Sequence, residues 1–221
     1  MCGIFGIVGD TPLAPRHLAV LARHAEQRGR DSSGLIFSNR DRVYSIKRGN
    51  IPVSDLLAGT NLSQAHIAMG HSRLVTNGLD DNQPIVRDGT CVLHNGIIVN
   101  EARAWESIES VPSLSIDTEV IAAVANRYIE SGTTPCELAG KVLTHLEGVV
   151  ACALMIPRLG KLILFSNNGS LYLGQKHNSH YFASESFALK DLGCDQITQV
   201  FEAGICLDVP IGNFEEQLEA V

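Results

Sequence analysis

The stretch Met1-Cys2-Gly3-Ile4-Phe5-Gly6-Ile7-Val8-Gly9 at the amino end decides the fold, and the chain is interpreted outward from it. Its apolar run predicts a buried strand, because short continuous apolar runs are typical of strands covered on both faces. If an aminopeptidase removes Met1, Cys2 carries both a thiol and a free α-amine. An α-amine has a pKa of about 7.7–8.0, so it can act as the general base for its own thiol. Cys2 is therefore a candidate N-terminal nucleophile, and the plain alternative is a cysteine that happens to begin a strand.

Size and composition set the class of protein. The 221 residues are enough for a sizeable core in one large or two small domains. A formal net charge of −7, without any run of Lys or Arg, argues against a nucleic-acid partner. No apolar stretch is long enough to span a membrane, and the amino end lacks the pattern of a signal peptide. The six cysteines show no C-x-x-C spacing, so neither a zinc site nor a disulfide framework is predicted, and a reducing, cytoplasmic compartment is expected.

Hydrophobic periodicity predicts a mixture of helices and strands. Helices are predicted between Pro15 and Gly29, over 53–57 and 185–189, from Asp117 to Tyr128, and from Pro135 to Leu146 after a capping box at Thr134 and Glu137. Strands are predicted over 35–37, 43–46, 67–72, 84–86, 91–94, 97–99, 149–156, 161–166, 170–174, 180–184 and 205–209. We expect a polar turn over 28–34, a loop over 79–83, and a connector or solvated helix over 214–219. This order predicts one α+β domain over residues 1–221, with helices covering two sheets.

The dipeptide Asn95-Gly96 follows a predicted strand and has two interpretations. It is typical of the central residues of a type I′ hairpin turn. It also offers two neutral donors, the Asn side-chain amide and the Gly backbone N–H, that can converge on one oxygen. Such a pair can form an oxyanion hole for acyl transfer. The local sequence alone favours the turn.

Arg73 and Asp117 are candidate substrate-binding residues. Arg73 ends a predicted strand; it is either a surface cation or a bidentate partner for a carboxylate. Asp117 is either the N-cap of the following helix or a carboxylate that binds an ammonium group. A carboxylate clamp, an ammonium clamp and an acyl-transfer site together describe an α-amino acid with a side-chain carbonyl, and glutamine fits that description.

The remaining polar residues suggest no cofactor. The histidines form no metal-binding pattern, and for His71 and His94 we favour core or hydrogen-bonding roles over catalysis. The glycines of the amino end do not have the spacing of a dinucleotide-binding fingerprint. Neither a metal nor a cofactor is therefore expected.

Five stretches of the chain form a recognisable series. They are Met1-Cys2-Gly3-Ile4, Arg28-Gly29-Arg30-Asp31-Ser32-Ser33-Gly34, Gly70-His71-Ser72-Arg73, His94-Asn95-Gly96-Ile97-Ile98 and Asp117-Thr118-Glu119. In this order they resemble the signature stretches of class II glutamine amidotransferase domains, and most of all the glutaminase half of glucosamine-6-phosphate synthase. The resemblance covers nearly all of the chain. It implies an N-terminal nucleophile hydrolase with a four-layer αββα sandwich of mostly antiparallel sheets.

The resemblance also implies a role for each matching residue. Cys2 attacks the glutamine amide while its α-amine shuttles the proton, and Asn95 and Gly96 stabilise the oxyanion. Arg73 binds the substrate α-carboxylate, Asp117 binds its α-ammonium, and Thr76 belongs to a loop that closes over glutamine. Arg28, Gly3 and Asn77 are supporting residues. The products are glutamate and ammonia.

Three positions depart from the family pattern. Leu74 replaces an aromatic residue that helps gate an ammonia channel, Asn77 replaces a histidine, and residues 167–169 replace an arginine-bearing turn. The family passes ammonia to a synthetase, so we expect either a separate synthetase subunit or a missing C-terminal domain. Two alternatives stay open: another N-terminal-cysteine amide hydrolase, and a catalytically quiet regulatory or partner-binding module.

Overall fold

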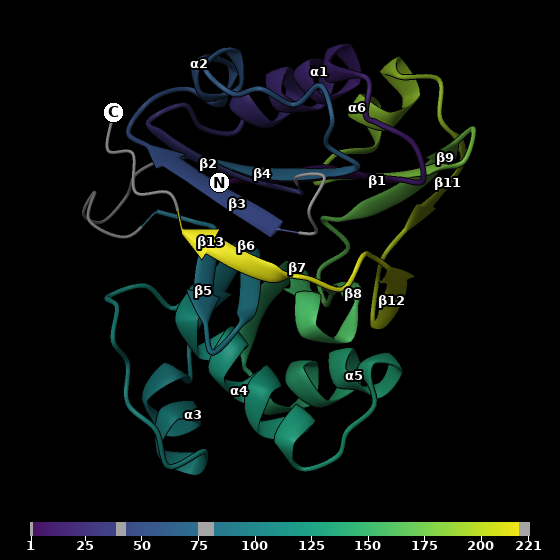
Figure 1. Ribbon diagram of the computed structural model, residues 1–221. Coiled ribbons are helices and arrows are strands. Elements are labelled where there is room, and N and C mark those ends of the chain that lie inside the picture. Colours follow the sequence, from purple (N-terminus) through teal and green to yellow (C-terminus); the bar gives the residue numbers. More distant parts are fainter. Residues whose placement is uncertain (1, 39–42, 75–81, 217–221) are drawn as a thin grey trace.

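The computed structural model describes residues 2–38, 43–74 and 82–216 (Figure 1). Its strands are β1 (Gly3–Gly9), β2 (Ser32–Ser38), β3 (Val43–Gly49), β4 (Ile67–Arg73), β5 (Ile85–Arg87), β6 (Thr90–Ile98), β7 (Gly148–Ile156), β8 (Lys161–Ser166), β9 (Tyr172–Lys176), β10 (Ser179–Ala183), β11 (Asp195–Gln199), β12 (Ala203–Asp208) and β13 (Asn213–Glu216). Its helices are α1 (Pro15–Glu26), α2 (Val53–Ala58), α3 (Glu101–Ser107), α4 (Thr118–Glu130), α5 (Pro135–His145) and α6 (Ser186–Asp191).

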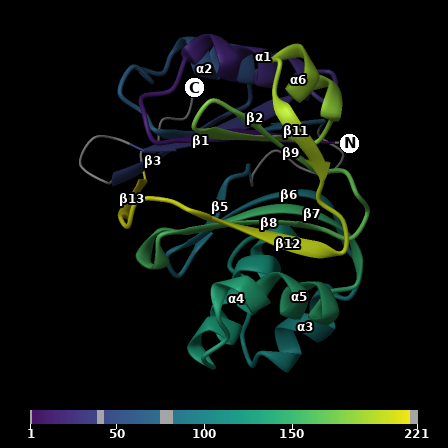
Figure 2. The same ribbon diagram turned by 90° about the vertical axis from the view of Figure 1, so that its right-hand side faces the viewer.

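Two sheets lie face to face and form the two middle layers (Figures 1 and 2). Within the described residues, the larger sheet has eight strands in the order β11-β9-β10-β1-β4-β2-β3-β13, and the smaller has five in the order β12-β8-β7-β6-β5. Neighbouring strands pair antiparallel, except that β13 runs parallel to β3. Helices α1, α2 and α6 cover the outer face of the larger sheet, and α3, α4 and α5 cover the smaller one. The predicted αββα sandwich is therefore confirmed.

The amino-terminal strand β1 lies in the middle of the larger sheet, between β10 and β4. Alternate side chains of a strand point to opposite faces. Ile4 and Val8 accordingly join the core between the sheets, and Phe5 and Ile7 join the core under the helices. The strand is buried on both faces, as its continuous apolar run predicts.

Several predicted elements are confirmed by the structure. Helix α1 begins at Pro15, and its buried residues Leu18, Leu21, Ala22 and Ala25 have the i, i+3, i+4, i+7 spacing of one helix face. The predicted capping box also forms, since the Glu137 carboxylate accepts hydrogen bonds from the backbone N and the hydroxyl of Thr134. The six cysteines, all of them in the described part of the chain, are free thiols. No helix among the described residues is long and apolar enough to cross a membrane.

Three predictions of local structure are wrong, and two elements were not predicted. Residues 32–34 begin β2 instead of completing a polar turn, and residues 213–216 form strand β13 instead of a connector or helix. Strand β6 does not end at Asn95-Gly96: Asn95 pairs with Ala151 and Gly96 with Val150 of β7, so no hairpin turn forms there. Helix α3 and strand β11 are present but were not predicted. Their sequences are largely polar, and tertiary packing outweighs the weak local pattern. Residues 79–81 of the predicted loop lie outside the described residues.

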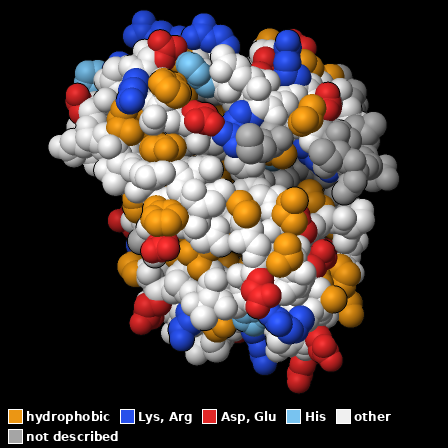
Figure 3. All heavy atoms as spheres, turned by 180° about the vertical axis from the view of Figure 1, so that it is seen from behind, with side chains coloured by type: hydrophobic (Ala, Val, Ile, Leu, Met, Phe, Trp, Pro, Cys, Tyr) orange, Lys and Arg blue, Asp and Glu red, His pale blue; other side chains and the backbone are white. Residues whose placement is uncertain are grey.

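The surface follows from this layered arrangement (Figure 3). On the face shown, charged side chains gather over the outer helices, while apolar side chains lie nearer the level of the two sheets. The exposed large apolar residues include Leu74 at the end of β4, and Ile97 and Val149 opposite each other on β6 and β7.

Gly3 is the point where helix α1 presses most closely on β1. A Cβ at Gly3 would lie 2.8 Å from the Cα of Ala25, a backbone atom that cannot rotate away. We therefore expect Gly3→Ala to lower the free energy of unfolding by about 1–3 kcal/mol, the usual cost of overpacking. Gly140→Ala is the matched control, because a Cβ there meets no atom within 4 Å. It should instead raise stability by about 0.5–1 kcal/mol, since alanine favours a helix over glycine. Urea unfolding of both variants checks this, and equal stability of the two would contradict it.

Candidate active site

Cys2 lies where the two sheets meet. It immediately precedes β1 of the larger sheet, and its backbone N donates a hydrogen bond of 3.2 Å to Oδ1 of Asn95 on β6 of the smaller sheet. Asn95 is buried and shares the inner face of β6 with Cys91 and Leu93. Because Oδ1 faces the Cys2 nitrogen, the amide Nδ2 is the atom through which Asn95 can donate to a bound oxygen. The structure thus brings together the predicted nucleophile and a predicted oxyanion donor.

Arg28 holds the start of β1 from the end of helix α1. Its Nε donates a 2.7 Å hydrogen bond to the Cys2 carbonyl, and its Nη1 forms an ion pair with Glu185. The guanidinium side chain is only 11% exposed. Next to it, the Ile4 backbone N donates to the Ser184 hydroxyl at 2.9 Å. The backbone at Cys2 is therefore fixed from two sides, and the supporting role of Arg28 in catalysis stays a prediction.

The surroundings of the Cys2 thiol favour its protonated form. Burial raises the pKa of Cys2, while the backbone N–H of Leu74 and the charges of Arg73 and Arg28 lower it by less. A thiol with a raised pKa carries little thiolate at neutral pH, so a nucleophilic attack needs a base. Burial also lowers the pKa of His71, to about 3, and that of His94, so neither imidazole is charged at neutral pH.

The outer edge of β6 presents a row of backbone N–H groups. The backbone N–H of Val150 donates to Oδ1 of Asn167, and the Val150 carbonyl accepts from the Asn167 N–H, so both groups of Val150 point away from β6. Gly96 is opposite Val150, so the antiparallel pattern turns the Gly96 N–H away from β7 as well. The same alternation turns the N–H groups of His94 and Ile98 to this edge. The His94 N–H donates a hydrogen bond of 2.6 Å to Oε1 of Gln83, and the Ile98 N–H donates one of 2.9 Å to Oδ2 of Asp117. The Gly96 N–H therefore lies between them on this edge, next to Asn95 in the strand.

Gly96 is needed for close packing. A Cβ at this position would lie 1.7 Å from the carbonyl oxygen of Val149. The glycine therefore serves the close approach of β7 to β6, and the hairpin turn suggested by the local sequence is ruled out.

Asp117 binds the strand and does not cap its helix. Asp117 occupies the N-cap position of α4, but its backbone is already helical and its side chain makes no capping hydrogen bond, so the predicted capping contact does not form. Instead Oδ2 accepts from the Ile98 N–H, and Oδ1 lies 3.9 Å from Nδ1 of His94. The side chain is still 26% exposed, which leaves the carboxylate accessible to a ligand.

Arg73 ends β4 next to the nucleophile. Its strand neighbour Ser72 pairs with Gly3, and the Arg73 carbonyl accepts a 2.9 Å hydrogen bond from the Asp31 N–H. A Cβ at Gly29 would lie 2.1 Å from the Leu74 nitrogen, so only glycine allows this approach. Residues 29–31, which were predicted as part of a polar turn, thus hold the strand end that carries Arg73.

Gln83 and Thr118 join the site without having been predicted. The Gln83 amide Nε2 donates to the His94 carbonyl at 2.9 Å and to the Thr118 hydroxyl at 3.1 Å. Nε2 of His94 lies 3.2 Å from the Val149 carbonyl and donates to it, so Nδ1 is the acceptor and faces Thr118 at 3.4 Å. This confirms the hydrogen-bonding role predicted for His94. No local sequence pattern marks Gln83, because its partners lie on other elements.

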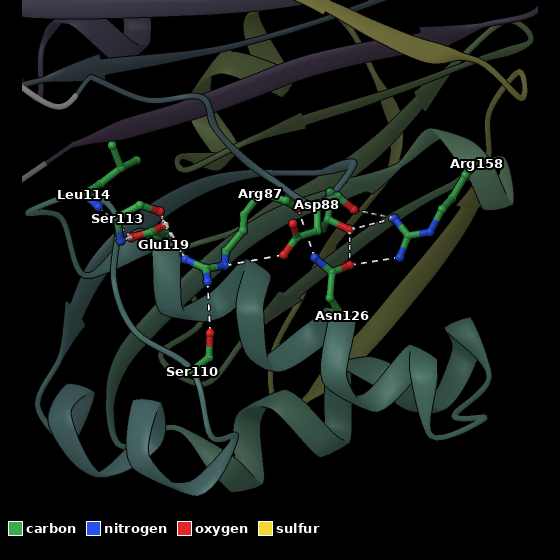
Figure 4. A network of polar contacts seen from close by, with 9 residues as sticks. Arg87, Asp88, Ser110, Ser113, Leu114, Glu119, Asn126 and Arg158 are labelled. Atoms are coloured by element: carbon green, nitrogen blue, oxygen red, sulfur yellow. Dashed lines mark hydrogen bonds and ion pairs between the residues drawn. The ribbon is translucent and has the colours of Figure 1, made fainter.

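A polar network beneath the site secures helix α4 (Figure 4). The Glu119 carboxylate accepts hydrogen bonds from the backbone of Ser113 and Leu114 and pairs with Arg87 of β5 at 2.6 Å. Arg87 also bonds to Ser110 and lies over the Trp105 ring. Burial alone raises the pKa of Glu119, but the hydrogen bonds from Ser113, Leu114 and Arg87 outweigh it and lower the pKa. Since Glu119 is two residues from Asp117, this network fixes the helix end that carries the predicted ammonium clamp.

Some predicted residues are not tested by this geometry. Thr76 and Asn77 lie outside the described residues. At 167–169, where the family pattern has an arginine-bearing turn, the Asn167 side chain bonds to Val150 and Gly148 and so stabilises the end of β7. Among the described residues, no three His, Cys, Asp or Glu side chains gather as metal ligands.

Comparison with known proteins gives concordant matches. The family model described as glutamine amidotransferase domain matches residues 71–191. The chain is 31% identical over 198 residues to the glutamine–fructose-6-phosphate aminotransferase (isomerizing) of Brucella abortus, covering 86% of this chain and 32% of that protein. It is 32% identical over 207 residues to the enzyme of the same name from Chlamydia trachomatis, covering 89% of this chain and 34% of that protein. The chain thus spans about a third of the length of these relatives.

Solved structures share the fold. Glutamine phosphoribosylpyrophosphate amidotransferase from B. subtilis superposes with a TM-score of 0.75 at 24% identity, covering 96% of this chain and 50% of that one. A structure titled as the allosteric regulatory enzyme of purine biosynthesis gives the same TM-score at 23% identity, covering 94% of this chain and 47% of that one.

Glu119 provides a test of the network that supports α4. Its side chain is 2% exposed, so Glu119→Ala leaves Arg87 and two backbone N–H groups without their acceptor inside the protein. We expect a loss of about 3–5 kcal/mol in unfolding free energy, as for other buried pairs that lose one partner. The exposed pair of Arg103 and Glu147 is the control, and Arg103→Ala should change stability little.

The same experiment has a defined pH dependence. The pKa of Glu119 is lowered in the folded protein, so its contribution is complete above the ordinary glutamate pKa and is lost as the pH falls through the folded value. Urea unfolding at several pH values should show the gap between wild type and Glu119→Ala closing in acid. A gap that widens as the pH falls would contradict this assignment.

Proposed function

Because this chain belongs to the glutamine amidotransferase domain family, we propose that it hydrolyses the side-chain amide of L-glutamine through a thioester on Cys2. The observation that carries the proposal is the contact between the Cys2 nitrogen and Asn95, with the outward-facing Gly96 N–H beside it. In this proposal Cys2, before β1 of the larger sheet, is the nucleophile, and Asn95 and Gly96 on β6 of the smaller sheet are the oxyanion donors. The proposal treats residues 1–221 as one glutaminase domain and needs no metal or cofactor.

The proposed reaction begins at the sulfur of Cys2 once Met1 has been removed. The sulfur attacks the amide carbon while the α-amine of the same residue takes the thiol proton. Asn95 Nδ2 and the Gly96 N–H stabilise the oxyanion, an effect worth about 10²–10³ in rate for a single donor. The amine then returns the proton to the leaving nitrogen, the carbon–nitrogen bond breaks, and ammonia departs. Water attacks the thioester in the same way and releases glutamate and the free thiol.

Two charged residues can bind the α-carboxylate and the α-ammonium of glutamine. Arg73 binds the α-carboxylate, and the accessible carboxylate of Asp117 binds the α-ammonium; Thr76 is assigned to substrate binding and Asn77 to a supporting role. Such charge-assisted hydrogen bonds are the stronger kind in proteins. They make a free α-amino acid the preferred substrate over a larger amide.

We propose that the ammonia passes to a synthetase, either a separate subunit or a further domain. The length of the relatives supports this, because the region like this chain makes up only about a third of each. Exposed apolar side chains beside the site also support it: Leu74 next to Arg73, and Ile97 next to Gly96. Exposed apolar patches commonly mark protein contacts.

Replacement of the nucleophile tests the activity directly. We expect Cys2→Ala to abolish glutamate release from L-glutamine, and a diazoketone analogue of glutamine to add one mass equivalent to wild type but not to the variant. Cys136→Ala is the control, since Cys136 is exposed and lies on α5 of the outer layer. Label on Cys2 without turnover would indicate that a synthetase must activate the enzyme. Retained Met1 with neither label nor turnover would refute the mechanism and leave a binding module.

The α-amine also predicts a pH profile. Burial raises the pKa of the Cys2 thiol, so the thiolate does not form by itself at neutral pH. The amine must be unprotonated to act as the base; therefore kcat/KM for glutamine should rise with pH towards the α-amine pKa, about 7.7–8.0 in model peptides. Initial rates between pH 6 and 9 check this. A rate that falls over that range would exclude the amine as base.

A further inference from the structure

We propose that Gln83 is a positioning residue for this reaction: its side chain holds the oxyanion strand β6 and the Asp117 end of helix α4 in one fixed arrangement. The inference rests on the proposed glutaminase activity. Gln83 is only 5% exposed and is assigned no contact with glutamine. It acts through the groups that flank the oxyanion site.

The Gln83 side chain takes the place of a strand. The ladder between β5 and β6 ends at the pair Ile85–Val92, and continuing it by two residues puts Gln83 opposite His94. There the side-chain amide makes both bonds that a neighbouring backbone would make, with Oε1 accepting from the His94 N–H at 2.6 Å and Nε2 donating to its carbonyl at 2.9 Å. The two bonds fix the direction of the amide, because reversing it would oppose two donors and two acceptors.

Gln83 is itself held from the larger sheet. A Cβ at Gly34 of β2 would lie 2.0 Å from the Gln83 carbonyl oxygen, so the main chain at Gln83 rests directly on that strand. The residue is therefore wedged between the two sheets. Its side chain bonds to β6 of the smaller sheet, while its backbone contacts β2 of the larger sheet. Cys2 and Asn95 also belong to different sheets, so their distance depends on how the two sheets are held together.

The first consequence concerns the oxyanion donors. The outward N–H groups of β6 alternate along one edge, and Gln83 fixes the group that precedes Gly96 while Asp117 fixes the one that follows it. Without Gln83, the buried N–H and carbonyl of His94 have no partner on this edge, and a buried polar group left unsatisfied is costly. The strand will then move to find other partners, and the Gly96 N–H and the Asn95 amide will move with it.

The second consequence concerns Asp117. The second hydrogen of Nε2 goes to the Thr118 hydroxyl, which in turn faces Nδ1 of His94 at 3.4 Å. Thr118 is fully buried and is the first residue of α4, directly after Asp117. One amide thus ties the ammonium clamp to the strand that carries the oxyanion donors. Loss of the amide is expected to affect substrate binding and turnover together.

The decisive variant is Gln83→Glu, which keeps the shape of the side chain. Its carboxylate can still accept from the His94 N–H but cannot donate to the His94 carbonyl or to Thr118. We expect kcat/KM for glutamine to fall by about 10²-fold, the scale of loss for a misplaced reactive group, with kcat lowered and KM raised. Thr118→Val removes the link from Gln83 to α4, together with the Thr118 contact to Nδ1 of His94, and should raise KM with little change in kcat. Gln175→Glu, an exposed glutamine on β9, is the matched control and should behave as wild type.

Two thiol reagents separate positioning from a general loss of structure. Iodoacetamide alkylates Cys2 without using the clamps, whereas a diazoketone analogue of glutamine needs both clamps and the oxyanion site. In Gln83→Glu, read by mass at the Cys2 peptide, the iodoacetamide rate should stay within about twofold of wild type and the diazoketone rate should fall at least tenfold. Gln83→Met, which keeps the length but no polar atom, should show the same split.

The outcomes distinguish this inference from the proposed function. Wild-type turnover with equal kcat/KM in Gln83→Glu overturns the positioning role and leaves the glutaminase intact. A parallel fall in both labelling rates also overturns it, because Gln83 would then act on the thiol or on the fold. A wild-type protein that shows neither turnover nor labelling refutes the proposed function, and the inference fails with it.

Discussion

The free edge of β6 is the constraint on which the site depends. Strand β5 stops pairing with β6 at Val92, so within the described part of the chain the next outward N–H groups, at His94, Gly96 and Ile98, have no neighbouring strand to bond. They follow each other at intervals of about 6.6 Å, since a strand rises about 3.3 Å per residue. The side chains of Gln83 and Asp117 accept hydrogen bonds from the N–H groups of His94 and Ile98. The Gly96 N–H lies between them, beside Asn95, whose side chain contacts Cys2. An unpaired sheet edge is usually a liability; here the fold uses it to present a donor.

For the proposed mechanism, the electrostatics of the site favour the amino terminus as the base. His94 and His71 are neutral because burial lowers their pKa values, and His94 already uses its Nε2 proton on the Val149 carbonyl. Arg28 is engaged by Glu185 and the Cys2 carbonyl, and a guanidinium cannot act as a base in any case. Burial also keeps the Cys2 thiol protonated. An amine on the nucleophile itself therefore fits the surroundings better than any neighbouring side chain.

The sequence was sufficient for those parts of the structure that depend on local patterns. The apolar run of β1, the periodicity of α1 and the capping box of α5 each have a local physical cause, and each is confirmed. Asn95-Gly96 shows the limit: its local preference is a turn, but pairing with Ala151 and Val150, more than fifty residues away, keeps it in a strand. Asp117 shows it again, because the Ile98 N–H competes successfully with the helix for its carboxylate.

The residues that hold the site were the hardest to predict. Gln83, Thr118 and Glu185 have their roles only through partners on other elements, so no local sequence pattern assigns those roles. The nucleophile and clamps could be proposed because their chemistry is specific to a residue type. A supporting amide or hydroxyl has no such chemical signature, and its function appears only when the sheets are in place.

The arrangement also explains why the chemistry depends on the whole fold. Cys2, Asn95 and Asp117 come from three distant parts of the chain, and each is fixed by a further segment: Cys2 by Arg28, the strand before Asn95 by Gln83, and the helix after Asp117 by Glu119. Donors that are already in position lose no energy to reorganisation as charge develops on the substrate. Folding fixes these positions, because moving a support would leave buried polar groups unpaired, which costs free energy. A substitution that loosens one of these supports therefore reaches the reaction without touching the substrate.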